Sequence, residues 1–276
     1  MKYPIQKKGR LFRKRKVRKN LIRKPANPRI AVPSFFTLMN LFCGFLSIIS
    51  VSQGNLSFGA WLIVFAGLFD ALDGLMARLA NATSEFGMEL DSLSDVVSFG
   101  VAPGFLIYNL GLADLQLVGV IIAALPPLCG AVRLARFNVN ARLDANTAEF
   151  YGLPIPAQAI ILCSLYLTYS QNAVFFDELS NGLNTILIPI VIFISFLMVS
   201  PVPFDKIPRF NAAALKGNKV KVIYFLIYLV IILTLQESGL MIALFLYILK
   251  GLFTGGKRFW MASFLESDDY PSNQRV

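Results

Sequence analysis

Residues 70–95 read DALDGLMARLANATSEFGMELDSLSD and place four aspartates between two long apolar runs. Asp70 and Asp73 close the run before this stretch, and Asp91 and Asp95 open the run after it. Residues three or four positions apart share one face of an α-helix. Each pair therefore lies on one face of its helix. If the two helices pack with these faces opposed, the four carboxylates converge.

Four converging carboxylates repel one another unless cations neutralise them. Ligand sets made only of oxygen suit hard divalent cations such as Mg²⁺ and Mn²⁺. Four negative charges balanced by two such ions match a two-metal site, which orients and neutralises a transferring phosphoryl group. Gly74 and Ala77 remove side-chain bulk from the same helix face, and Arg78 at its margin offers a guanidinium suited to phosphate.

A second interpretation is that the aspartates pair with Arg78 or line a proton path. One arginine cannot compensate four carboxylates, and ionisable residues at membrane depth usually serve a function. We therefore favour a phosphoryl-transfer site that holds two divalent cations.

The composition is that of an integral membrane protein. Of the 276 residues 56% are hydrophobic, mean hydropathy is +0.62, and the apolar residues fall in long blocks. The first thirty residues are basic and lack an apolar core, so we expect no cleavable signal peptide. The chain has no histidine, which excludes a Ser-His-Asp triad and His-ligated zinc.

We predict an all-α polytopic bundle of about eight transmembrane helices with the N-terminus in the cytoplasm. The predicted spans are 33–53, 57–80, 92–111, 115–138, 155–171, 183–201, 220–235 and 239–254. In this topology all 26 lysines and arginines lie on the cytoplasmic side and none lies in the opposite connections, as the positive-inside rule requires. The aspartates then lie at the cytoplasmic face of the cell (inner) membrane, where a soluble substrate can meet a lipid head group.

The chain divides into three regions by charge and hydropathy. We expect a basic cytoplasmic juxtamembrane arm at 1–32, a transmembrane domain at 33–255 and a cytoplasmic polar tail at 256–276. Residues 1–30 contain 13 lysines or arginines and no acid. Because they adjoin a membrane span and contain few aromatics, we expect them to contact anionic membrane lipid and no nucleic acid.

The aspartate stretch resembles a known family signature. The spacing Asp70-x2-Asp73-Gly74-x2-Ala77-Arg78-x8-Gly87-x3-Asp91-x3-Asp95 is similar, at all eight positions, to the signature of the CDP-alcohol phosphotransferases. Further stretches resemble bacterial-type phosphatidylserine synthases: PSFFTLMNLFCGFLS at 33–47, DSLSDVVSFGVAPG at 91–104, RLARFNV at 133–139, FYGLPIPAQA at 150–159 and, less closely, MVSPVPFDK at 198–206. One departure is Ser34, where many relatives have asparagine.

The resemblance implies a reaction and roles for individual residues. A phosphatidyl group would pass from CDP-diacylglycerol to the hydroxyl of L-serine, giving phosphatidylserine and CMP. Two divalent cations, Mg²⁺ or Mn²⁺, would be held by Asp70, Asp73, Asp91 and Asp95, with Asp95 also the general base. CDP-diacylglycerol would contact Gly74, Arg78 and Ser84. The polar residues Thr37 and Asn40, which repeat at three-residue spacing at the start of the first span, could touch its cytidine or ribose. The acceptor would contact Arg133, Arg136, Asn138 and Gln158. A homodimer is implied as well.

Residues outside the aspartate group also have a structural interpretation. Ser84 fits a helix cap. Thr37 and Asn40 lie three residues apart and fit bonds between neighbouring helices. Arg133 and Arg136 fit cations that reach lipid phosphate at the membrane surface.

Three other functions compete with serine transfer. The same chemistry could use glycerol 3-phosphate or inositol phosphate, but residues 133–138 offer only two cations, which favours a zwitterionic acceptor. A cation transporter could use the aspartates, yet no polar stripe continues across the membrane. A membrane anchor could recruit anionic partners through the basic arm.

Overall fold

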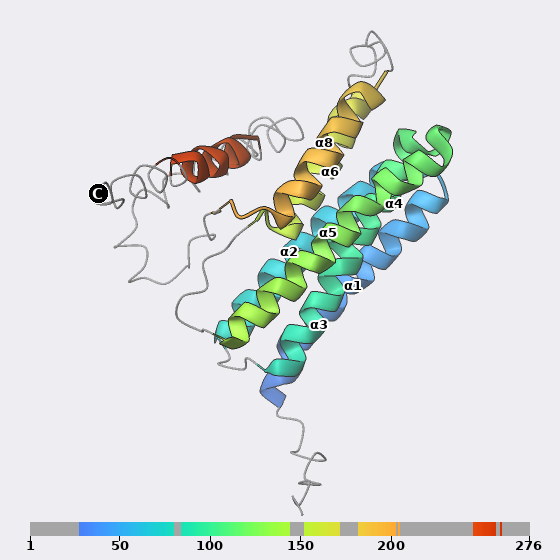
Figure 1. Cartoon of the computed structure of the whole chain (residues 1–276). Coiled ribbons are helices and arrows are strands. Elements are labelled where there is room, and N and C mark those ends of the chain that lie inside the picture. The colour runs from blue at the N-terminus through green and yellow to red at the C-terminus, as the bar shows by residue number, and fades with distance from the viewer. Residues whose placement is uncertain are drawn as a thin grey trace, which may run out of the picture.

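The computed structural model describes residues 28–79, 84–143, 152–171, 182–202, 204, 245–257 and 260. These residues are mainly helical, with no strand in the ranges given (Figure 1). Among the described residues, three helical runs are long and apolar enough to cross a membrane: Ser34–Ser52, Leu56–Leu79 and Glu85–Asn140. The prediction of an all-helical membrane protein is confirmed at this level.

The helices occur along the chain in the following order. α1 spans Pro28–Ser52, α2 spans Leu56–Leu79 and α3 spans Glu85–Asp95. A π-helical turn at Val96–Val101 leads into α4, Ala102–Ile107. A second π-helical turn, Tyr108–Leu112, and a 3-10 turn, Ala113–Leu115, lead into α5, Gln116–Leu143. α6 spans Ile155–Gln171, α8 spans Asn184–Val199, and 245–257 is helical.

The predicted spans agree with these bounds unevenly. α2, α6 and α8 agree with the predictions 57–80, 155–171 and 183–201 to within two residues. The predicted span 220–235 and most of the arm and the tail lie outside the described residues. The count of eight spans and the cytoplasmic N-terminus stay predictions.

The helix that leads into the third predicted span is longer than the span itself. The predicted span is 92–111, whereas α3 begins at Glu85. The Oγ of Ser84 accepts a hydrogen bond from the Gly87 N–H at 3.0 Å and so caps this helix. Glu85 in the first turn adds a favourable charge at the positive end of the helix. Asp91 therefore lies on the same helix as Asp95, as their spacing predicted, and Ser84 has the capping role that the sequence also allowed.

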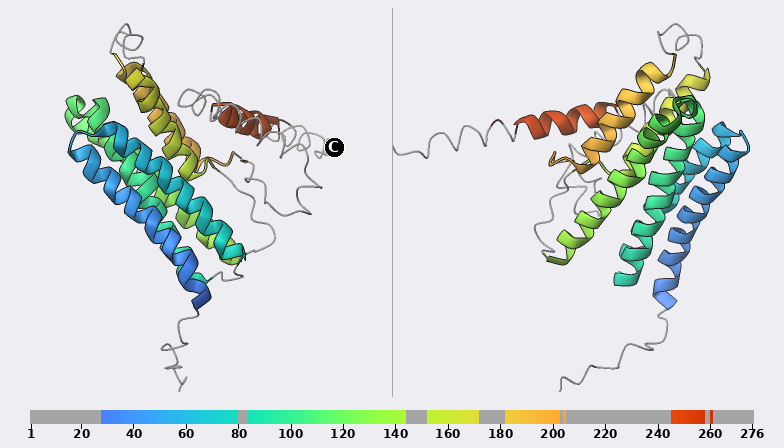
Figure 2. Two further views of the ribbon diagram at one scale, coloured as in Figure 1. Left: turned by 180° about the vertical axis from the view of Figure 1, so that it is seen from behind. Right: turned by 45° about the vertical axis from the view of Figure 1, so that its right-hand side comes forward.

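The long helices run side by side, and α6 and α8 cover one side of the bundle (Figures 1 and 2). Small residues allow several of these helices to approach closely. A Cβ added to Gly44 of α1 would lie 2.7 Å from the Cα of Ser98, and one added to Gly100 would lie 2.9 Å from the Cα of Pro127. Close packing at small residues is the usual way in which membrane helices associate.

The start of α6 is hydrogen-bonded to the end of α8. The Gly152 N–H donates to the Val202 carbonyl at 2.8 Å, and the Leu153 N–H donates to the Leu197 carbonyl at 3.1 Å. Gly152 has a φ of +81°, and a Cβ there would lie 2.0 Å from the Met198 carbonyl oxygen. Glycine is thus required both by the backbone conformation and by the close contact.

Gly152→Ala is therefore expected to destabilise the fold. The left-handed backbone alone costs on the order of 1–3 kcal/mol for a residue with a Cβ, and the contact with Met198 adds to that cost. Gly54→Ala is the matched control, because Gly54 has a φ of +84° and an added Cβ there would meet no atom of the described residues within 4 Å, its chain neighbours aside. Thermal unfolding in detergent should show a larger fall in Tm for Gly152→Ala; equal falls would contradict the contact.

Candidate active site

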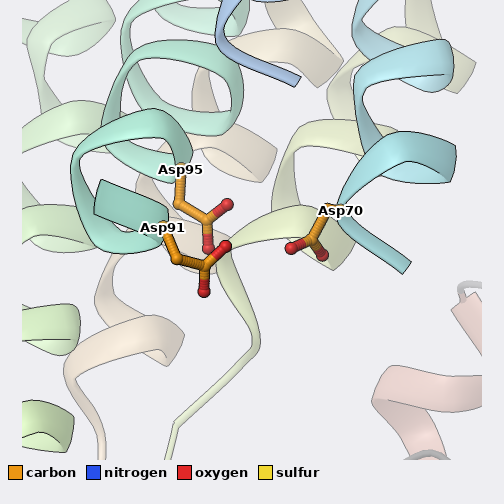
Figure 3. A group of neighbouring side chains, drawn as sticks. All are labelled: Asp70, Asp91 and Asp95. Carbon is orange, nitrogen blue, oxygen red and sulfur yellow. The ribbon is translucent and has the colours of Figure 1, made fainter. Parts of the chain in front are cut away.

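Three aspartates from two helices converge at one end of the bundle. Asp70 of α2 faces Asp91 and Asp95 of α3, and one carboxylate oxygen from each lies within 4.8 Å of the others (Figure 3). Asp91 and Asp95 are one helical turn apart, so both carboxylates reach the same side of α3. The side chain of Asp95 is only 7% exposed. We call Asp70, Asp91 and Asp95 the carboxylate cluster.

Asp73 lies beside the carboxylate cluster and has a partner on α1. The Thr37 hydroxyl donates a hydrogen bond to Oδ2 of Asp73. The backbone carbonyl of Thr37 in turn accepts a hydrogen bond from the Oγ of Ser94 at 3.1 Å. Both Thr37 and Asp73 are buried. α1 is thereby bonded at one residue to the two helices that carry the aspartates.

Asn40 repeats this arrangement one turn later on α1. Its Nδ2 donates to Oδ1 of Asp95 at 3.2 Å. Its backbone carbonyl accepts from the Oγ of Ser98 at 2.9 Å. The sequence predicted Thr37 and Asn40 as contacts of the nucleotide and missed these bonds to the aspartates. The available signal was their three-residue spacing, which also fits bonds between helices.

Gly74 and Arg78 form an open, cationic margin of the site. A Cβ added to Gly74 would meet only the Arg78 guanidinium among the described residues, at 3.4 Å from one of its terminal nitrogens. Arg78 lies in the last turn of α2 and is exposed. An anionic group can therefore approach the α2 backbone at Gly74 and meet the guanidinium there.

The two predicted acceptor-binding arginines occupy different environments. Arg133 is only 7% exposed, and its charge interacts with the carboxylate of Asp95. Arg136 is exposed and donates a hydrogen bond from Nη1 to the carbonyl of Val199 at 3.1 Å. Arg133 is therefore close enough to Asp95 for their charges to interact, whereas Arg136 joins α5 to the end of α8.

The two predicted acceptor-binding amides also differ. Asn138 donates from Nδ2 to the Oγ of Ser92 at 2.9 Å and so joins α5 to α3 beside Asp91. Gln158 of α6 is fully buried, and neither atom of its amide has a hydrogen-bond partner within the described ranges. A buried amide without a partner is costly, and a polar ligand could supply the missing bonds.

The residues present suit divalent cations. The atoms that converge at the site are carboxylate oxygens, which Mg²⁺ and Mn²⁺ prefer as ligands. Three carboxylates within 4.8 Å carry more negative charge than Arg133, a buried arginine whose charge interacts with Asp95, can compensate. Hydrogen bonds from Thr37 and Asn40 hold two of the four aspartates in place, as outer partners commonly do at metal sites.

Comparison with family models gives one match over most of the chain. The model described as CDP-alcohol phosphatidyltransferase matches residues 30–261. The chain belongs to the CDP-alcohol phosphatidyltransferase family. The family match covers the carboxylate cluster, α1 with Thr37 and Asn40, and the arginines of α5.

Curated members of the family resemble the chain over most of its length. A CDP-diacylglycerol–serine O-phosphatidyltransferase of Helicobacter pylori is 34% identical over 228 residues, which is 83% of this chain and 92% of that protein. The protein of the same description from Bacillus subtilis is 35% identical over 189 residues, 68% of this chain and 97% of that protein. An archaetidylserine synthase of Methanothermobacter thermautotrophicus is 38% identical over 186 residues, 67% and 73% respectively.

Proposed function

We propose that this phosphatidyltransferase-family protein transfers a phosphatidyl group from CDP-diacylglycerol to the hydroxyl of L-serine, giving phosphatidylserine and CMP. The carboxylate cluster is the observation that carries the chemistry. The names of the Helicobacter and Bacillus relatives support serine as the acceptor. The protein is thus an enzyme of phospholipid synthesis embedded in a membrane.

Four aspartates are assigned to the metal site. Asp70, Asp73, Asp91 and Asp95 would hold two divalent cations, Mg²⁺ or Mn²⁺. When bound, such ions neutralise the pyrophosphate and make CMP a better leaving group. Asp73 can take part through the carboxylate oxygen that Thr37 does not engage, because Thr37 donates to Oδ2.

The phosphates of CDP-diacylglycerol are assigned to the open margin of the site. Arg78 would pair with a phosphate, and the absence of a side chain at Gly74 lets the substrate reach the backbone. Ser84 uses its oxygen as an acceptor in the helix cap, which leaves its own O–H available as a donor to the nucleotide.

Asp95 is assigned as the general base. It would accept the proton of the serine hydroxyl while that oxygen attacks the lipid-side phosphorus. A new bond forms between the serine oxygen and phosphorus, and the bond from phosphorus to the CMP oxygen breaks. The nucleophile belongs to the substrate, so no covalent enzyme intermediate is required.

The acceptor is assigned to the side of the cluster next to α5 and α6. Arg133 would bind the serine carboxylate, because it is a buried cation that interacts with Asp95. The amide of Gln158 would complete its missing hydrogen bonds with the same substrate. Arg136 and Asn138 would stabilise the α5 side of the acceptor site. Arg136 does so through its hydrogen bond to Val199, and Asn138 through its hydrogen bond to Ser92.

The acceptor can be tested directly with purified protein. CDP-diacylglycerol, Mn²⁺ and a panel of labelled alcohols are supplied, and CMP release and the lipid product are measured. We expect serine to give CMP and phosphatidylserine. Release of CMP with glycerol 3-phosphate or inositol phosphate, but not with serine, would support phosphatidyl transfer and contradict serine as the acceptor.

Removal of divalent cations should abolish the activity. We expect CMP release to stop in the presence of a strong chelator and to return when Mg²⁺ or Mn²⁺ is added in excess, because the cluster supplies only oxygen ligands. Unchanged thermal unfolding in chelator would show that the loss is not caused by unfolding. Full activity after exhaustive chelation would contradict the metal assignment.

We also propose that the site faces the cytoplasm, that the basic arm contacts anionic lipid and that the protein can form a homodimer. Single cysteines introduced at Ser84 and Asp114, in a variant without its native cysteines, test the orientation in sealed cells. A membrane-impermeant thiol reagent should label position 114 and spare position 84. The reverse pattern would invert the topology.

A further inference from the structure

We propose that Thr37 and Asn40 are positioning residues that set the spacing between the aspartates of α2 and those of α3, and thereby the affinity of the site for divalent cations. The proposal rests on the metal site of the proposed function. It gives these residues a different role from the nucleotide contact that the sequence suggested. It also assigns α1, which carries no aspartate, a part in building the metal site.

Both residues use the same pair of bonds. Each donates from its side chain to a carboxylate, Thr37 to Asp73 and Asn40 to Asp95. Each also accepts a serine hydroxyl at its backbone carbonyl. Because the two serines, Ser94 and Ser98, flank Asp95 on the same helical run, the segment that carries Asp95 is fixed to α1 on both sides.

α1 is the element that connects the two halves of the site. It packs along α2 and against α3, whereas α2 and α3 are in much less extensive contact with each other. The aspartates of α2 and α3 repel one another, so contacts with another helix are needed to keep the carboxylates close. α1 provides these contacts, because Thr37 donates a hydrogen bond to Asp73 of α2 and Asn40 donates one to Asp95 of α3.

The surroundings make these hydrogen bonds effective. Thr37 is 1% exposed and Asn40 is fully buried, so water does not compete for their donors. Hydrogen bonds to charged groups are stronger than those between neutral groups. One turn after Asn40, Gly44 lets the α1 backbone touch Ser98, which fixes the two helices against sliding.

The experiment compares apolar and conservative variants of similar size. Thr37→Val and Asn40→Leu remove the donors, while Thr37→Ser keeps the hydroxyl. Ser47→Ala is the matched control: Ser47 is a buried α1 residue that also bonds to another helix, through its Oγ to the Gly59 carbonyl at 2.8 Å, but it lies away from the aspartates. Binding of Mn²⁺ to detergent-solubilised protein without substrate is measured from the electron paramagnetic resonance signal of free Mn²⁺.

We expect Thr37→Val and Asn40→Leu to weaken Mn²⁺ binding by roughly tenfold to a hundredfold, as the loss of a bond to a charged group implies. Thr37→Ser and Ser47→Ala should bind Mn²⁺ as the wild type does. The Mn²⁺ concentration for half-maximal CMP release should rise in parallel, with little change in KM for CDP-diacylglycerol. Ser94→Ala, which leaves every aspartate and both donors in place, should give a smaller change in the same direction.

Wild-type Mn²⁺ affinity in Thr37→Val and Asn40→Leu, with a raised KM for CDP-diacylglycerol, would overturn the positioning role in favour of substrate contact. A loss of Mn²⁺ affinity in Ser47→Ala as large as that in Asn40→Leu would also overturn it, since general loosening of α1 would then suffice. Failure of the wild type itself to bind Mn²⁺ would instead refute the metal site of the proposed function.

Discussion

Asp95→Asn is expected to lower kcat for CMP release by about 10³-fold or more, within the range that general bases contribute. Asparagine has nearly the same shape but cannot take up a proton. It also removes one negative charge from a cluster whose three carboxylates lie within 4.8 Å. The loss of a ligand charge weakens the site for divalent cations, so both effects act in the same direction.

Asp114→Asn provides the control for this substitution. Asp114 is exposed in the 3-10 turn that precedes α5, at the opposite end of the helical run from Asp91. The kcat of the Asp114→Asn variant should equal that of the wild type. The measurement is CMP release at saturating CDP-diacylglycerol, serine and Mn²⁺. If Asp95→Asn kept more than a tenth of the wild-type kcat, another group would have to be the base.

Arg133→Met is expected to raise KM for serine by roughly tenfold to a hundredfold, which corresponds to a lost hydrogen bond to a charged group. The reason for this expectation is that Arg133 is buried and that its charge interacts with that of Asp95. Arg133→Lys should recover part of the loss, because lysine keeps the charge but not the planar fork.

Arg136→Leu should behave differently although it lies one turn away. Its guanidinium donates to the Val199 carbonyl, so we expect a lower Tm and an unchanged KM for serine. Initial rates at varied serine and thermal unfolding of both variants separate the two effects. A raised KM for serine in Arg136→Leu alone would assign acceptor binding to Arg136 instead.

The strongest patterns in the sequence predicted most of what positions the site. Apolar blocks of helical length predicted the bounds of α2 and α6 closely, because each of these helices ends where its apolar block ends. The three- and four-residue spacing of the aspartates predicted which of them share a face. α3 begins before the predicted span, since the short polar segment after the cap at Ser84 is helical but does not have the hydropathy of a membrane span. α1 begins at Pro28 and α5 ends at Leu143, each five residues outside the predicted spans 33–53 and 115–138.

Contacts between helices could not be predicted in the same way. The resemblance implied acceptor contact for both Arg133 and Arg136, yet Arg133 is buried and Arg136 bonds to the end of α8. The partners of Thr37 and Asn40 depend on how α1 is rotated against two other helices. Such rotations are set by close contacts such as Gly44 with Ser98, which hydropathy along a single chain does not record.

The bonds between the start of α6 and the end of α8 have a consequence for biogenesis. The N–H groups of Gly152 and Leu153 find their acceptors at Val202 and Leu197, which leave the ribosome much later. Until Leu197 and Val202 have been synthesised, those donors lack their final partners. We therefore expect this corner of the protein to be completed last, so that nascent chains released before Val202 should be preferred targets of membrane proteases.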